Sequence, residues 1–141
     1  MKKTYFLSKI TTFILCFILL AGTTTAFAAG KQLMSYNGTG IMAKASVSNF
    51  TLSEEPTITI DHNQSLNPAY AKNTDARMDV NLQKKGTLKY SNTGDTKTCK
   101  GGVGFKKNYT KSKGTYRLYF SSHQYADQIT PKFDISGTVT K

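Results

Sequence analysis

Apolar and polar side chains alternate along several short segments between residues 41 and 140. The clearest alternating segments are 41–47, 57–61, 78–83 and 116–120, and shorter ones lie at 88–90, 103–105, 133–135 and 137–140. Because successive side chains of a β-strand point to opposite faces, this period of two predicts strands with one buried face. Helical spacing of apolar residues is missing after residue 29, although 67–76 has room for one helical turn.

Turn-forming residues separate the predicted strands. They are Asn37-Gly38, Glu55-Pro56, Asn67-Pro68, Lys85-Gly86, Asn92-Thr93-Gly94, Gly101-Gly102 and Lys113-Gly114. Glycine, proline and asparagine favour the backbone angles that tight turns need. Seven to nine short strands at this spacing predict an all-β fold, namely a small antiparallel β-sandwich, with a small β-barrel as the alternative.

The alternation also predicts which side chains form the core. The expected inward set is Ile41, Val47, Phe50, Ile58, Ile60, Met78, Val80, Leu82, Leu88, Phe105, Tyr116, Leu118, Phe120, Phe133, Ile135 and Val139. About 110 residues are enough for one domain with a modest core.

The first 28 residues have the three parts of a secretory signal peptide. Lysines open the segment, residues 10–20 are almost wholly apolar, and Ala26-Phe27-Ala28 supplies a small-x-small cleavage pattern. The apolar run is shorter than the roughly 20 residues that a membrane-spanning helix needs, which disfavours a retained anchor. We therefore expect a signal peptide over 1–28, a single domain over 29–141, and a secreted protein that is extracellular or associated with the cell wall.

Cysteine usage refines this expectation. Removal of the signal removes Cys16 and leaves Cys99 alone, so the mature domain has no internal disulfide. A lipoprotein signal would place a cysteine at the cleavage point, and Cys16 lies inside the apolar run instead. Poverty in cysteine together with a short, lysine-led signal favours a bacterial protein.

Positive charge is concentrated in one third of the predicted domain. Residues 29–83 carry four basic and five acidic side chains, whereas residues 84–113 carry nine lysines and only Asp95 as an acid. The nine lysines are Lys84, Lys85, Lys89, Lys97, Lys100, Lys106, Lys107, Lys111 and Lys113. Neighbouring strands of a meander lie side by side, so we expect these lysines to gather at one edge or end of the sandwich.

A lysine-rich face of this kind predicts contact with an anionic partner. Lysine is a hydrated point charge and not a bidentate reader of phosphate, which favours an envelope polymer, a lipid surface or an acidic protein over sequence-specific nucleic acid. The alternative is that the lysines only protect edge strands and keep the protein soluble. Tyr90, Phe105 and Tyr109 could stack on bases or sugars, but aromatic residues in strands more often belong to the core.

The sequence contains few residues in a pattern typical of an enzyme active site. Cys99, a histidine (His62 or His123) and Arg117 share residue types with sortase-like transpeptidases. The mature chain is short for that fold, and nothing else around these residues matches it. We therefore expect no catalytic residues.

Metal and cofactor sites are not expected either. Residues 61–72 imitate the alternating oxygen ligands of a calcium loop, but Leu66 and Lys72 stand where glycine and glutamate are needed, so a polar loop is the simpler interpretation. The two histidines have no partner at zinc-ligand spacing. No glycine-rich phosphate loop is present.

These observations predict a secreted, non-catalytic β-sandwich protein that contacts an anionic envelope component or acidic partner through residues 84–113. Two other functions remain open. A small cationic exported protein can act as an antimicrobial or toxin on the membranes of competing cells. It can also be an inhibitor or adhesin that binds another protein through a loop.

Overall fold

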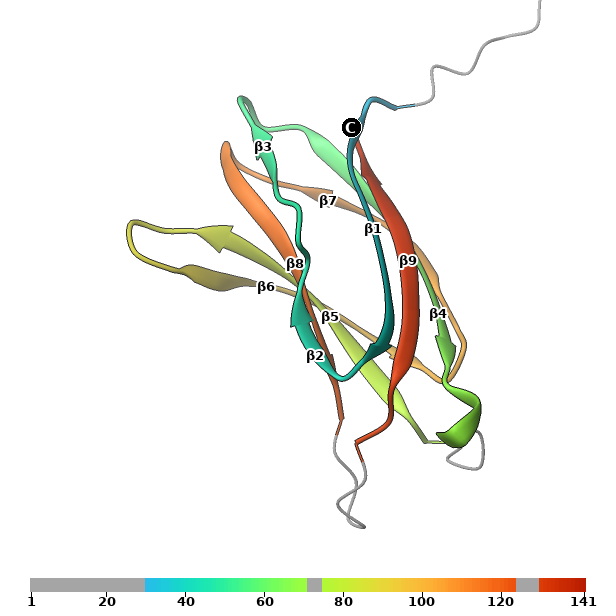
Figure 1. Ribbon diagram of the computed structural model, residues 1–141. Coiled ribbons are helices and arrows are strands. Elements are labelled where there is room, and N and C mark those ends of the chain that lie inside the picture. The colour runs from blue at the N-terminus through green and yellow to red at the C-terminus, as the bar shows by residue number, and fades with distance from the viewer. Residues whose placement is uncertain (1–29, 71–74, 124–129) are drawn as a thin grey trace, which may run out of the picture.

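The computed structural model describes residues 30–70, 75–123 and 130–141, which form nine strands and one short helical turn (Figure 1). The strands are β1 (Gln32–Ile41), β2 (Ala43–Ala45), β3 (Phe50–Leu52), β4 (Thr57–Leu66), β5 (Arg77–Lys85), β6 (Tyr90–Lys100), β7 (Phe105–Thr110), β8 (Gly114–Ser122) and β9 (Phe133–Thr140). The single turn of 3-10 helix, Pro68–Tyr70, lies within the segment where one helical turn was predicted.

The strands form two antiparallel sheets. Sheet A has the order β1-β9-β4-β7, and sheet B has the order β2-β8-β5-β6, with β3 also paired to β8. The prediction of an all-β fold is confirmed. Strands β7 and β6 are the last strands of their sheets, and a turn of only four residues, 101–104, joins them, so both edges lie on the same side of the molecule.

One hydrophobic core lies between the two sheets. It contains Met34, Ile41, Phe50, Leu52, Ile58, Ile60, Ala76, Met78, Val80, Leu82, Tyr109, Tyr116, Leu118, Phe120, Phe133, Ile135 and Val139. Thirteen of the sixteen predicted inward residues belong to it. Alternation is thus a reliable guide to the buried face of β4, β5, β8 and β9, where each inward side chain meets the opposite sheet.

Three predicted core residues are elsewhere. Val47 is 90% exposed and Leu88 is 97% exposed, whereas Phe105 is half-buried at the rim of the core. Both exposed residues lie outside regular strands, in the segment between β2 and β3 and in the turn between β5 and β6. Val47 lies two residues after the end of β2, and Leu88 lies two residues before the start of β6, so neither side chain takes part in the alternation of a strand.

Strand boundaries explain these corrections. The predicted strand 41–47 is wrong, because β1 ends at Ile41 and β2 covers only three residues, paired with β8 of the other sheet. The predicted turn at Asn37-Gly38 is also wrong, since both residues pair with β9 inside β1. The chain changes sheets between Ile41 and Ala43. Just before this change, Gly40 has a positive φ of 63° and donates its N–H to Asp134 at 2.8 Å.

One further turn prediction was wrong, and two predicted strands are in fact one. Residues 92–94 lie inside β6, where Gly94 has a φ of 85° and the register against β5 shifts between Asn81 and Gln83, as in a β-bulge. The predicted strands 133–135 and 137–140 form one strand, β9, which passes through Gly137. A Cβ atom at Gly137 would lie 2.2 Å from the carbonyl oxygen of Asp61. The glycine therefore permits close approach of β4, not a turn.

The predicted signal peptide, residues 1–28, lies outside the described residues. Within the described part of the chain, no helix has the length and apolar character that a membrane crossing requires.

Candidate anion-binding surface

The candidate site is the lysine-rich region, which we define as residues 84–113. It begins at the end of β5 and continues through the β5–β6 turn, β6, the 101–104 turn, β7 and the β7–β8 turn. The region therefore includes both edge strands of the β6–β7 side, together with the turns next to them. The nine lysines are spread along these neighbouring elements, from the β5–β6 turn at one end of β6 to Lys100 at the other end, and they do not all point in one direction.

Three of the lysines point toward the space between the sheets, at its open rim. Lys84 continues the inward alternation of Val80 and Leu82 on β5, and Lys97 shares the inward side of β6 with Cys99. Lys107 lies between Phe105 and Tyr109 in the same alternation on β7, and its Nζ is 5.1 Å from the centre of the Tyr109 ring.

Four other lysines point outward or lie in turns. Lys85 and Lys100 are on the outer face of sheet B, Lys106 is on the outer face of sheet A, and Lys89 is in the exposed β5–β6 turn. Two of these four have acidic partners. Lys100 lies 2.8 Å from Asp75 and Lys106 lies 3.7 Å from Asp61, and both pairs are exposed enough to contribute little to stability.

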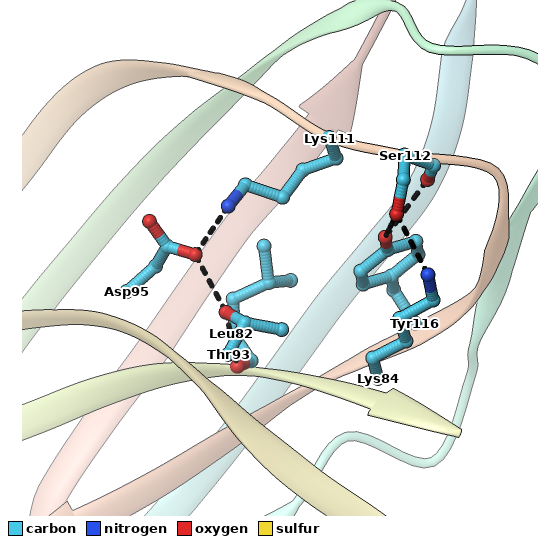
Figure 2. A network of polar contacts seen from close by, with 7 residues as sticks. All are labelled: Leu82, Lys84, Thr93, Asp95, Lys111, Ser112 and Tyr116. Carbon is cyan, nitrogen blue, oxygen red and sulfur yellow. Dashed lines mark hydrogen bonds and ion pairs between the residues drawn. The ribbon is translucent and has the colours of Figure 1, made fainter. Parts of the chain in front are cut away.

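Lys111 and Lys113 come from the β7–β8 turn, and Lys111 is the least exposed member of an ion pair in the region. Figure 2 shows Lys111 reaching from this turn to Asp95 of β6, whose carboxylate also accepts a hydrogen bond of 2.6 Å from Thr93. The Thr93 hydroxyl lies 3.0 Å from the carbonyl oxygen of Leu82 on β5. These contacts link the β7–β8 turn, which follows strand β7 of sheet A, to the edge strand β6 of sheet B.

A second tie lies beside the first one. Lys84 donates a hydrogen bond of 2.7 Å to the hydroxyl of Ser112, and the Tyr116 hydroxyl donates one of 2.8 Å to the Ser112 carbonyl (Figure 2). The Lys84 Nζ is also 5.6 Å from the centre of the Tyr116 ring. These contacts hold the end of β5 and the β7–β8 turn together, so Lys84 and Lys113 are close on the surface.

Asp95 is the acid of the lysine-rich region, and its carboxylate responds to the surrounding cations. Partial burial opposes its ionisation, but the hydrogen bonds from Lys111 and Thr93 and the charge of Lys107 outweigh this effect and lower the pKa. Asp95 is therefore charged at neutral pH and neutralises part of the local positive potential.

We expect the Asp95→Asn variant to change stability and polyanion binding in opposite directions. Loss of the partly buried ion pair should lower the free energy of unfolding by about 1 kcal/mol, whereas loss of one negative charge should strengthen binding to a polyanion. Urea unfolding and polyanion titration of the same preparation measure the two effects. Weaker binding by a folded variant would contradict this role of Asp95.

Cys99 and the two histidines, which were compared with the residues of transpeptidases, do not contact one another in the contacts described here. Cys99 is a free, buried thiol, and burial raises its pKa even though Lys97 acts in the opposite direction. His62 is wholly buried and bonds to Tyr36, whereas the surface residue His123 lies 3.1 Å from Asp79.

The aromatic residues that were considered for stacking on bases or sugars pack against other side chains of the protein. Tyr109 is buried in the core, and the Phe105 ring lies 5.4 Å from the ring of His62. The Arg117 guanidinium covers the Tyr90 ring at 4.1 Å from its centre. Tyr109 is therefore a core residue, and Phe105 packs at the rim of the core.

The segment that imitated a calcium loop is part of a strand. Asp61, Asn63 and Ser65 point to the outer face of β4, so the predicted polar loop was wrong up to Leu66. No group of three or more histidine, cysteine or acidic side chains is close enough to hold a metal within residues 30–70, 75–123 and 130–141.

Sequence reasoning missed an open hollow of about 510 Å³ on the outer face of sheet A. It is lined by Asn37, Gly38, Thr39, Asn63, Gln64, Ser65, Asp134, Ile135 and Ser136. The register places Asn37 and Asn63 on either side of Ser136. Amides and hydroxyls in a row can hydrogen-bond a polar ligand, but none of the nine lysines lines this hollow.

Comparison with protein-family models, with curated proteins and with solved structures found no match to the chain. The geometry and charge of the lysine-rich region are therefore the basis on which a function is proposed.

Proposed function

We propose that this chain is an exported bacterial protein, folded as an antiparallel β-sandwich, that binds a polyanion of the cell envelope through its lysine-rich region. The proposal assigns it a binding role and no catalytic one. Its signal peptide, residues 1–28, would direct it to the outside of the cell, where such polyanions are found.

The single observation that carries the proposal is the placement of lysines on the β6–β7 side. Within the described part of the chain, six of them form no ion pair with an acid: Lys84, Lys85, Lys89, Lys97, Lys107 and Lys113. They lie at the end of β5, on the edge strands β6 and β7, and in the turns next to these strands. Screening acts over about 8 Å at physiological ionic strength, so neighbouring lysines present a shared field.

The expected strength is modest and depends on salt. Each lysine near an anionic surface contributes about 1 kcal/mol. Only part of the region can face one plane, because Lys106 and Lys85 lie on the outer faces of different sheets. A polymer that wraps around the β6–β7 side can contact more of these lysines than a rigid flat surface can.

Matched charge variants test the proposal. Replacement of Lys85, Lys89 and Lys113 by glutamine removes three charges from the lysine-rich region, and replacement of Lys31, Lys44 and Lys132 removes the same number elsewhere. We expect the first variant to bind purified anionic cell-wall polymer at least about tenfold more weakly than the wild type at physiological salt. We expect the second variant to bind nearly as well as the wild type.

The comparison separates a local site from total charge. Equal weakening of the two folded variants would show that net charge alone attracts the polymer, and the proposed surface would be wrong. A salt wash of the producing culture adds a readout on the native protein, because contact through lysine predicts release as ionic strength rises.

A further inference from the structure

The β5–β6 hairpin extends away from the rest of the molecule (Figure 1). Its turn, residues 86–89, is closed by a hydrogen bond of 2.8 Å from the Gly86 N–H to the Lys89 carbonyl. Leu88 lies in this turn with 97% of its surface exposed, the highest value among the large apolar residues recorded as exposed. An isolated exposed leucine needs no explanation by itself, but this one occupies the tip of a projecting element.

The hairpin is rigid at its base. On the outer face, the Arg117 guanidinium covers Tyr90 and its Nε donates to Gln83 at 2.8 Å, while Gln83 bonds across the hairpin to Asn92 at 2.9 Å. On the inner face, Lys84 bonds to Ser112. These contacts hold the base of the hairpin against β8 and the β7–β8 turn, and the tip with Leu88 projects from this base.

The charges around Leu88 have one sign. Lys84, Lys85 and Lys89 flank the tip, and the sequence from 80 to 94 contains no acidic residue. The Lys84–Ser112 contact also brings Lys113 close to the base of the hairpin. The element therefore presents an apolar tip with cationic groups immediately behind it.

We infer that the β5–β6 hairpin docks on an anionic lipid bilayer and inserts Leu88 into the interface. An anionic bilayer has negatively charged headgroups outside and acyl chains a short distance below, which is the order in which the hairpin offers lysine and leucine. A soluble polyanion would satisfy the lysines but would leave Leu88 in water. The inference goes beyond the proposed function: it adds the lipid bilayer as a second anionic surface of the envelope, which the tip of this hairpin contacts.

The absence of tryptophan from the chain permits a direct test. Leu88→Trp places a reporter at the tip, and Val47→Trp places one at another exposed aliphatic position, 90% exposed and outside the hairpin. With vesicles of phosphatidylglycerol and phosphatidylcholine, we expect a blue shift of emission for Leu88→Trp only. Brominated acyl chains should quench that emission, and vesicles of phosphatidylcholine alone should give no shift.

A second pair of variants tests the contribution to affinity. Leu88→Ser should bind the anionic vesicles about tenfold more weakly, whereas Val47→Ser and Leu88→Ile should bind like the wild type. Unchanged emission of Leu88→Trp on vesicles that carry the protein down in a sedimentation assay would overturn the insertion. Binding to soluble anionic wall polymer without binding to vesicles would overturn it while the proposed function stands, and failure to bind either would remove both.

Discussion

Replacement of Phe120 by alanine is expected to lower the free energy of unfolding by about 3–5 kcal/mol. Phe120 is 2% exposed on β8 of sheet B, and its ring lies 5.2 Å from the ring of Tyr36 and 5.9 Å from that of His62, both of sheet A. Removal of the ring leaves a cavity where the two sheets meet. Because small domains have a total stability of about 5–15 kcal/mol, much of the native population could be lost.

Urea unfolding measures this effect, with Val47→Ala as the control. Val47 is 90% exposed, so its truncation should change the free energy of unfolding by less than about 0.5 kcal/mol. Phe120→Leu should recover most of the lost stability, since it refills part of the cavity. A loss below about 1 kcal/mol for Phe120→Ala would show that this ring does not join the two sheets as described.

The second large effect is a loss of stability in mild acid, and its source is the buried His62. The amide nitrogen of Gln64 donates to the Gly101 carbonyl, which leaves its Oε1 to accept from His62 Nε2 at 3.2 Å. The His62 Nδ1 then accepts from the Tyr36 hydroxyl at 2.9 Å. This chain of hydrogen bonds fixes the neutral form of the imidazole.

The direction of the pH effect follows from burial. Burial lowers the pKa of His62 below its usual value of 6.5, although Gln64 and Asp61 act in the opposite direction. The unfolded chain therefore takes up a proton that the folded chain resists as the pH falls below 6.5. Stability is complete above that pH and declines below it, until the pKa of the folded state is reached.

The urea midpoint is the appropriate measurement, taken at several values between about pH 7.5 and pH 5. We expect the midpoint to fall across this range in the wild type and in His123→Gln. In His62→Gln, a less stable protein, the fall should be much smaller because the titrating group is gone. A midpoint of the wild type that stays constant across the range would contradict this account of His62.

The buried face of the fold was predictable from sequence wherever a strand is long and paired on both sides. In β4, β5 and β8 the alternating side chains meet a neighbouring sheet at every inward position, so period and burial agree. The same alternation continues beyond Ile60 through His62 and Gln64, which are buried polar residues. Sequence reasoning missed these two residues because polar side chains are normally expected to be exposed.

The ends of the strands were hard to predict, because glycines occur inside strands and because pairing stops at positions that the sequence does not mark. Gly38 and Gly94 lie within strands, at a close approach or a bulge, whereas sequence reasoning takes glycine as a turn signal. The exposure of Val47 and Leu88 could not be deduced from apolar character, since it depends on where pairing stops.

The candidate site was predictable as a region but not as a surface. The excess of lysine over residues 84–113 is a property of the sequence, whereas the pairing of Lys111 with Asp95 depends on how the β7–β8 turn packs against β6. The direction of each lysine also depends on strand register, which places Lys106 and Lys107 on opposite faces of sheet A. Local charge counts contain no information about register.

The salt dependence of binding to purified anionic cell-wall polymer tests the central claim most directly. The logarithm of the affinity of the wild type should fall linearly with the logarithm of the salt concentration. The slope should be smaller by about two to three for the variant with glutamine at 85, 89 and 113, and unchanged for the variant with glutamine at 31, 44 and 132. Identical slopes for the two folded variants would contradict a binding surface in the lysine-rich region.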